Sequence, residues 1–277
     1  MPNDVFDTLL RLANEVSGHA YTPYSNRPVG VVGLLSDGTW VPGVRVENAS
    51  FPLVIPALTA AYSATRCAAR DDLIAVVQNR PFRESDPLFL SEALGFSWEL
   101  AEPAKTPTPL TAESPLGKGA VLVQKGVDEL PTPGNRLNIY LEAAPEADDG
   151  EMLRLAESVA QRAHIPESGF PVGCVVTAED GSRIPGCNVE HADWTRGLCA
   201  ERIALATARA YGHRSFRRIH LACSLEPNPA SCGACRQVLF ELAAGVPVVL
   251  ARGNKPPKIT TPEQLLPGGF RGDALRA

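Results

Sequence analysis

Apolar side chains near the start of the chain recur every three or four positions: Val5, Leu9, Leu12 and Val16. The last three of them recur 143 positions later: Met152, Leu155 and Val159. This spacing places the apolar side chains on one face of an amphipathic helix. We therefore expect two such helices, related by an internal repeat.

Two short apolar runs follow each expected helix. They span residues 29–35, 40–46, 172–177 and 183–189. The Asp-Gly pair between the runs, Asp37-Gly38 in one copy and Asp180-Gly181 in the other, is typical of the turn of a β-hairpin. Because the same offset of 143 relates all these features, the sequence predicts a tandem duplication.

Beyond its hairpin, the second copy predicts further alternation of helices and strands. We expect helices over residues 199–211 and 232–243 and strands over residues 218–223 and 246–250. Such alternation favours a mixed β-sheet covered by helices. Residues 102–118, with four prolines, predict an irregular connection, and residues 144–150 predict a linker. We place the domain boundary there, giving domains 1–148 and 149–277.

The charge balance of the 277 residues limits the classes of partner that the protein is expected to bind. With 26 basic against 31 acidic residues, the chain has no broad attraction for phosphate backbones or anionic membranes. No apolar run approaches the length of a membrane span, and the first twenty residues lack a signal-peptide pattern. We expect a small neutral substrate, with no nucleic-acid or membrane partner.

Cysteines fall unevenly along the chain. Of the seven, one lies in the first half and six lie in the second. An odd, lopsided count without an export signal indicates reduced thiols or metal ligands in the cytoplasm. Four of them stand in apolar surroundings and are expected in the core: Cys67, Cys174, Cys187 and Cys223.

The other three cysteines have the spacing of a zinc site. Cys232 and Cys235 would place both sulfurs on one face of a first helical turn, and Cys199 would supply a third thiolate. Three protein ligands leave one tetrahedral position open for water, as in catalytic zinc sites. Glu201 then becomes the expected proton carrier. Arg202, one turn from Cys199, and Arg236, beside Cys235, are the candidates to offset the negative charge of the thiolates from outside the ligand shell.

A Cys-x-x-Cys pair alone has other interpretations, namely a buried pair or a redox dithiol. Its combination with Cys-Ala-Glu about thirty residues upstream favours one Zn²⁺ per chain, held by the second domain only.

These motifs, in their order along the second half, resemble the cytidine deaminase family. The matching segments are Phe170-Pro171-Val172-Gly173, Gly186-Cys187-Asn188-Val189-Glu190, Cys199-Ala200-Glu201-Arg202, Cys232-Gly233-Ala234-Cys235-Arg236-Gln237 and Leu265-Leu266-Pro267-Gly268-Gly269-Phe270. The resemblance includes the three-cysteine variant of the zinc-deaminase signature, with a glutamate that is not a ligand. It implies an α/β class: a tandem duplication of a cytidine-deaminase-like α/β/α sandwich with a mixed β-sheet.

The resemblance also implies roles for residues around the metal. Phe170 would pack against the pyrimidine, while Asn188 and Glu190 would hold the ribose hydroxyls. The backbone of Ala200 would meet the base, and Phe270 would close a neighbouring site. The implied activity is hydrolytic deamination of cytidine and 2'-deoxycytidine to uridine and 2'-deoxyuridine in pyrimidine salvage.

Two other hypotheses stay open. Where the family usually has Asn-Ala-Ser-Tyr, this chain has His191-Ala192-Asp193-Trp194, which leaves room for a deaminase of a modified cytosine nucleoside. A non-catalytic, zinc-stabilised binding protein is the third hypothesis, against which the intact Glu201 argues.

The first copy keeps the frame but loses the reactive side chains. At the offset of 143, Pro56 stands for Cys199 and Leu58 for Glu201, so the first domain is expected to be non-catalytic. We expect it to supply an interface, so that a homodimer would form a pseudo-tetramer of domains. Arg27 and Arg45 replace Phe170 and Asn188 respectively. Solvated ion pairs are the favoured interpretation of these arginines, and a small-anion site is the alternative.

Overall fold

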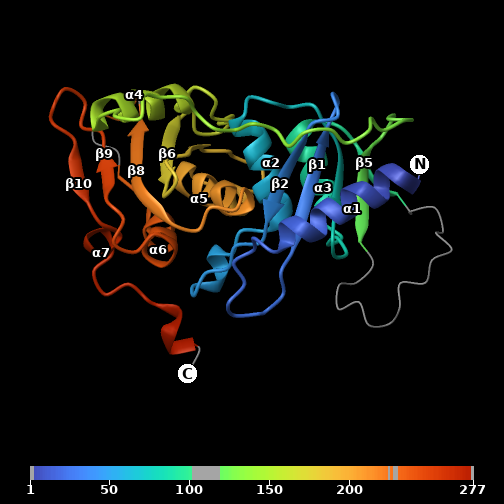
Figure 1. The fold of residues 1–277 in the computed structure, drawn as a ribbon, viewed down its shortest axis with the longest axis horizontal. Helices are drawn as coiled ribbons and strands as arrows, with labels where there is room; N and C mark the ends of the chain where they lie inside the picture. The colour runs from blue at the N-terminus through green and yellow to red at the C-terminus, as the bar shows by residue number, and fades with distance from the viewer. Residues whose placement is uncertain (1–2, 102–118, 224, 227–229, 276–277) are drawn as a thin grey trace.

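In the part of the first half that the structure describes, the chain forms three helices, a short 3-10 helix and five strands (Figure 1). The structure is a computed structural model that describes residues 3–101, 119–223, 225–226 and 230–275. The irregular connection expected at 102–118 lies outside the described residues. The elements are α1 (Asn3–Ser17), β1 (Gly30–Leu35), β2 (Trp40–Val44), η1 (Phe51–Leu53), α2 (Ala57–Cys67), β3 (Leu73–Gln78), α3 (Asp86–Leu94), β4 (Trp98–Ala101) and β5 (Ala120–Gln124).

The second half repeats the same order over its first six elements. They are α4 (Asp149–Ala160), β6 (Val172–Ala178), β7 (Arg183–Cys187), η2 (Trp194–Arg196), α5 (Ala200–Ala210) and β8 (Phe216–Cys223). The chain continues with α6 (Gly233–Leu242), β9 (Val248–Leu250), β10 (Lys258–Thr260), α7 (Pro262–Leu265) and η3 (Gly272–Leu275). Both expected hairpins and the four later elements of the second copy are confirmed.

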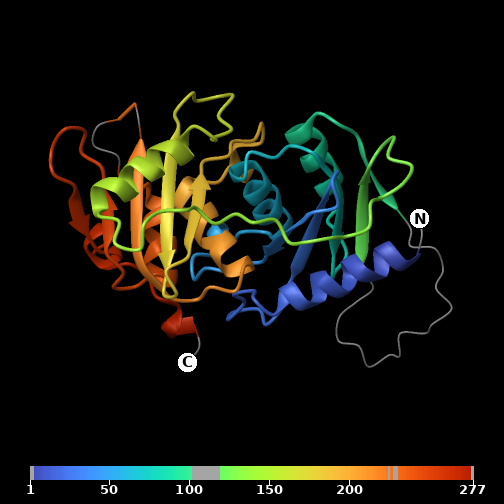
Figure 2. The ribbon, with the colours of Figure 1, turned by 45° about the horizontal axis from the view of Figure 1, so that its top comes forward.

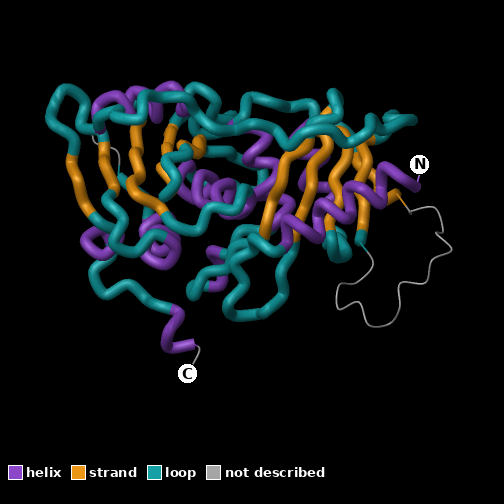
Figure 3. Tube along the Cα trace, viewed as in Figure 1, coloured by secondary structure: helices purple, strands orange, loops and turns teal. Residues whose placement is uncertain are grey.

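The strands form two separate five-stranded sheets, visible as two groups of strands in Figure 3. The second sheet has the order β10-β9-β8-β6-β7 and is mixed, because α6 connects β8 to its parallel neighbour β9. The first sheet has the order β2-β1-β3-β5-β4, and all its pairings are antiparallel. The predicted mixed sheet therefore holds for the second copy. In the first copy, α3 leads into the hairpin of β4 and β5, which reverses the direction of the strand beside β3.

Helices cover both faces of each sheet (Figure 2). A Cβ on Gly30 would lie 2.1 Å from the carbonyl oxygen of Ala13 in α1, so α1 covers the face of Gly30. Val31, which points to the opposite face, pairs with Gly43, where a Cβ would lie 2.3 Å from the Ala57 oxygen of α2. The two helices therefore lie on opposite faces, as an α/β/α sandwich requires.

The second copy repeats these close approaches at the offset of 143. Gly173 lies against Ala156 of α4, and Gly186 lies against Ala200 and Ala204 of α5. Since Gly186 lets α5 approach β7, it also sets the position of the helix that begins beside Cys199.

Gly186→Ala is expected to destabilise the protein by about 1–3 kcal/mol, because it overpacks this helix-sheet contact. The added Cβ would lie 2.2 Å from the Ala200 carbonyl oxygen and 2.6 Å from the Ala204 nitrogen. Denaturant unfolding measures the change. Gly134→Ala is the matched control, because its Cβ would meet only the Gly38 oxygen at 3.6 Å. An equal effect of both substitutions would contradict the close packing described for Gly186.

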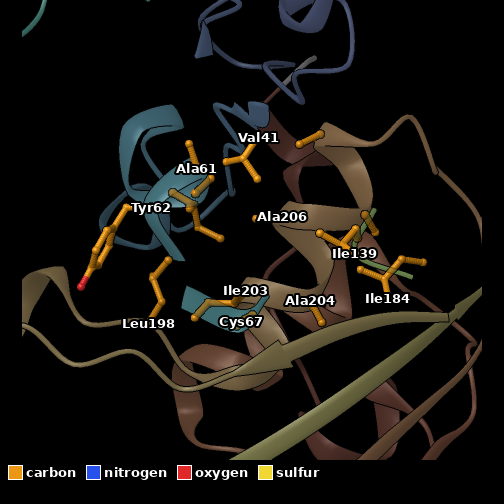
Figure 4. Close-up of a cluster of buried hydrophobic side chains, with 14 of the residues drawn as sticks. Val41, Ala61, Tyr62, Cys67, Ile139, Ile184, Leu198, Ile203, Ala204 and Ala206 are labelled. Carbon is orange, nitrogen blue, oxygen red and sulfur yellow. The ribbon is translucent and has the colours of Figure 1, made fainter. Parts of the chain in front are cut away.

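The two halves share a core along α2 and α5 (Figure 4). Ala61 and Tyr62 of α2 and Ile203 and Ala206 of α5 belong to this one buried cluster. Cys67, at the end of α2, has its Sγ 2.9 Å from that of Cys187 and accepts a hydrogen bond from the Cys187 backbone at 3.1 Å. Apolar surface of each half is therefore covered by the other half.

The four cysteines expected in the core are all buried, which confirms that prediction: Cys67, Cys174, Cys187 and Cys223. Among the described residues, no helix combines the length and the apolar character that crossing a membrane demands.

Candidate metal centre and active site

Two helix N-termini bring three cysteine side chains together. Cys199 is the N-cap of α5, and Cys232 is the N-cap of α6, with Cys235 in the first turn of α6. The three Sγ atoms lie within 4.8 Å of one another, and those of Cys199 and Cys232 are 3.7 Å apart. Cys235 is buried, whereas Cys232 is exposed, so the cluster opens to solvent on one side.

This donor set fits zinc. Thiolate sulfurs at about 2.3 Å from a tetrahedral zinc stand about 3.8 Å apart, close to the separation of the Cys199 and Cys232 sulfurs. Soft thiolate ligands select zinc over magnesium or calcium. Three ligands from the protein leave one coordination position for water, as the sequence predicted.

The thiols influence one another strongly. Hydrogen bonds from the Cys199 and Cys235 thiols, together with backbone N–H groups of Cys235 and Ala234, lower the pKa of Cys232. The hydrogen bond to Cys232 raises the pKa of Cys199 to about 12, and contacts with the other two thiols raise that of Cys235. The three thiols therefore ionise in competition with one another. A divalent cation is what makes all three thiolates favourable.

Glu201 lies beside this cluster in the first turn of α5. Its side chain is only 3% exposed, and its Oε2 accepts a hydrogen bond from the Cys235 Sγ at 3.3 Å. Burial raises the pKa of the carboxyl group, an effect that Ser231 and Cys235 partly oppose. A raised pKa lets a carboxyl group take up a proton more readily, as a proton carrier must.

Two of the predicted ribose ligands fasten the loop before β6. Asn188 accepts a hydrogen bond from the Val172 backbone at 2.8 Å and donates one to the Phe170 carbonyl at 2.9 Å. Glu190 Oε2 accepts from the backbone N–H groups of Glu167 and Ser168. Although burial opposes ionisation of Glu190, these hydrogen bonds lower its pKa. Both side chains thus fix the segment that carries Phe170.

The remaining predicted substrate residues occupy different environments. Ala200 is fully buried in the first turn of α5, between Cys199 and Glu201. Phe170 is 42% exposed and Phe270 is 49% exposed, so each presents part of its ring to solvent. The Phe270 carbonyl accepts a hydrogen bond from Gln237 of α6 at 2.8 Å. Their contacts with a nucleoside stay predictions.

Comparison with known proteins identifies the family. Two family models described as cytidine and deoxycytidylate deaminase zinc-binding region match the chain, one over residues 2–79 and one over residues 146–251. A cytidine deaminase of Sporosarcina psychrophila is 36% identical over 129 residues, covering 46% of this chain and 95% of that protein. The chain belongs to the cytidine deaminase family.

Other members of the cytidine deaminase family match in the same proportion. The protein of Halalkalibacterium halodurans is 37% identical over 130 residues, covering 46% of this chain and 98% of its own length. The crystal structure of cytidine deaminase from Burkholderia pseudomallei shares 35% identity with a TM-score of 0.43, covering 45% of this chain and 100% of that one. The curated relatives thus correspond to a single copy of the duplicated chain.

The first copy belongs to the cytidine deaminase family without its metal ligands. Pro56 is the N-cap of α2, as Cys199 is of α5, and Leu58 stands where Glu201 stands. Within the described residues, the cluster of Cys199, Cys232 and Cys235 is the one set of side chains arranged to hold a metal ion.

The Arg202 side chain contacts the first half of the chain. Its Nη2 donates to the Leu53 carbonyl at 3.4 Å, and its Nε is buried without a hydrogen-bond partner. The predicted compensation of thiolate charge stays a prediction. The structure adds that η1 of the first half lies beside the first turn of α5.

Contacts between the halves near α6 were not anticipated from the sequence. Glu241 of α6 accepts hydrogen bonds from the Ala49 backbone at 2.7 Å and from the hydroxyls of Tyr21 and Tyr24 at 3.1 and 2.6 Å. No motif marks these residues, because their meeting depends on how the two halves pack. They hold the first-half segment that precedes η1 against the second half.

Proposed function

We propose that this chain is a zinc-dependent cytidine deaminase of pyrimidine salvage, which hydrolyses cytidine and 2'-deoxycytidine to uridine and 2'-deoxyuridine. The observation that carries the proposal is the buried Glu201 beside three converging cysteine sulfurs. This combination suits hydrolysis of a cytosine amino group and has no purpose in a purely structural metal site.

The chain's own residues divide the chemistry between them. The three cysteines would hold zinc, which when bound supplies Lewis acidity and lowers the pKa of a water molecule towards neutral. Glu201 takes a proton from the attacking water, whose oxygen bonds to C4 of the cytosine ring. Glu201 passes this proton to the adjacent ring nitrogen. It then takes the second proton from the new hydroxyl group on C4 and delivers it to the departing amino group, so that the C4 carbonyl forms as the C4–N bond breaks and ammonia leaves. Phe170, held by Asn188, would pack against the pyrimidine.

We further propose a division of labour between residues 1–148 and residues 149–277, with the first domain non-catalytic. The Leu53 carbonyl accepts a hydrogen bond from Arg202, which supports a role for the first domain as a wall of the active site.

Two exposed aromatic rings support a homodimer. Phe51 in η1 is 83% exposed and Trp194 in η2 is 65% exposed, and the offset of 143 relates them. Rings that face solvent at equivalent positions suit a symmetric interface. Seven unbridged cysteines support the cytoplasm as the compartment.

The sequence His191-Ala192-Asp193-Trp194 does not need an unusual substrate to explain it. His191 is buried, stacks on Phe89 of the first half with ring centroids 4.7 Å apart, and contacts the Phe89 carbonyl at 3.2 Å. Packing between the halves therefore accounts for this histidine.

Loss of cytidine's ultraviolet absorbance tests the proposal with the zinc-loaded full chain. We expect rapid conversion of cytidine and deoxycytidine, with release of one ammonia per uridine formed. Failure to convert either nucleoside, in protein shown to contain zinc, would transfer support to a modified nucleoside or to a zinc-stabilised binding protein.

A further inference from the structure

The first half has its own cavity at the position equivalent to the active site. It measures about 270 Å³ and is lined in part by Arg27, Arg45, Pro56 and Leu58. These four residues stand at the offset of 143 from Phe170, Asn188, Cys199 and Glu201. The duplication has therefore kept a hollow here while exchanging these four side chains.

Four arginines line this cavity: Arg27, Arg45, Arg80 and Arg83. Arg45 forms an ion pair with the buried Glu47 at 3.1 Å, so this pair is neutral. Asp86 also lines the cavity, and its Oδ2 accepts from the Arg83 backbone at 2.8 Å. Three remaining guanidinium groups against one carboxylate leave an excess of two positive charges.

The guanidinium groups are available to a ligand. Arg80 donates through Nε to the Pro28 carbonyl at 3.0 Å. This hydrogen bond orients the guanidinium group and leaves its two terminal nitrogens available to a ligand. In the part of the chain that the structure describes, the Arg27 and Arg83 guanidinium groups form no hydrogen bond or ion pair. The Nε of Arg45 is buried and likewise has no hydrogen-bond partner.

The start of α2 adds to the positive potential. Ala57 and Leu58, the first two residues of α2, line the cavity. No side chain caps this N-terminus, and no acidic residue stands in its first turn. The N–H groups and the helix dipole therefore favour an anion at the same place as the arginines.

We propose that this first-half cavity binds a phosphate monoester. Such a group carries a charge of about −1.5 to −2 at pH 7, which matches the excess of two positive charges. Arginine binds phosphate oxygens in a bidentate manner, with a geometry that lysine cannot reproduce. The cavity has room for more than the phosphate itself, so the ester carries a small organic body. The first domain is thus a ligand-binding domain as well as a structural one, whether or not the second domain deaminates cytidine.

Isothermal titration calorimetry on the zinc-loaded full chain, at constant ionic strength, tests this binding with ribose 5-phosphate, inorganic phosphate and ribose. We expect ribose 5-phosphate to bind at least as tightly as inorganic phosphate, and ribose not to bind. The double variant Arg27→Gln, Arg83→Gln should weaken binding of ribose 5-phosphate by about tenfold or more, through loss of charge-assisted hydrogen bonds.

Arg217→Gln is the matched control, because Arg217 is an exposed arginine of the second half that pairs with Glu179. It should leave the affinity unchanged. The double variant should unfold in denaturant at the same midpoint as the parent, which shows that it is folded whether or not the chain turns over cytidine. The proposal is overturned if ribose 5-phosphate does not bind, if the double variant binds it as well as the parent, or if Arg217→Gln weakens it equally. Binding of inorganic phosphate with exclusion of ribose 5-phosphate would also overturn it.

Discussion

A Glu201→Gln enzyme is expected to lose cytidine turnover by about a hundred- to ten-thousandfold while it keeps its zinc. Glutamine preserves the shape of the side chain but cannot take a proton from water or return one to the ring. Glu201 is buried and hydrogen-bonded to Cys235, so the substitution removes a carboxylate that lies directly beside the cysteine cluster. Steady-state rates and zinc content, measured on the same preparation, check the prediction.

Glu157→Gln provides the matched control for this loss. Glu157 is exposed on α4, so its substitution removes a carboxylate without approaching the metal site. Activity of Glu201→Gln near that of the control would remove Glu201 from the mechanism. Loss of zinc from Glu201→Gln would instead assign it a role in holding the metal.

Cys235→Ser is expected to abolish turnover by a different route, through loss of the metal. Cys235 is the most buried of the three cysteines, and its sulfur links the cluster to Glu201. Replacing a soft thiolate by a hydroxyl removes one of three ligands, for which we expect a loss of zinc affinity of at least about a hundredfold. Zinc content after dialysis against a weak chelator measures this loss.

The control for Cys235→Ser is Cys223→Ser, which removes a buried thiol that lies outside the cluster. That variant should keep one zinc per chain. Retention of zinc by Cys235→Ser would show that the cluster is not the binding site. Zinc loss in both variants would show that the metal depends on the stability of the fold rather than on the ligand.

Local features of this chain were predictable because their causes are local. Helix α5 was expected over 199–211 and observed at Ala200–Ala210, since apolar spacing and Gly212 define its ends. The convergence of three cysteines followed from spacing and from the family resemblance. Contacts between the halves were not predictable in this way. The stacking of His191 on Phe89 depends on how the surfaces of two folded halves fit together, which no periodicity encodes.

The arginine-lined cavity of the first half likewise combines residues that the sequence indicates with residues that only the fold brings together. Arg27 and Arg45 are identifiable from the sequence because the repeat pairs them with Phe170 and Asn188. Arg80 and Arg83 come from the segment after β3, where the two copies no longer correspond closely. Only the fold brings that segment to the start of α2, so the sequence suggested two arginines where the structure has four.

The shared core along α2 and α5 has a consequence for the evolution of this protein. In an assembly of identical one-copy chains, every substitution appears in all subunits, so no subunit can change alone. Here the two halves are different segments of one chain, so a substitution can change one half alone. Each half nevertheless covers apolar surface of the other, across contacts such as that of Cys67 with Cys187. Selection can therefore alter the chemistry of one half while packing forbids its deletion. A duplicated chain can thus carry Pro56 and Leu58 at the positions of Cys199 and Glu201 and still need both halves to complete its core.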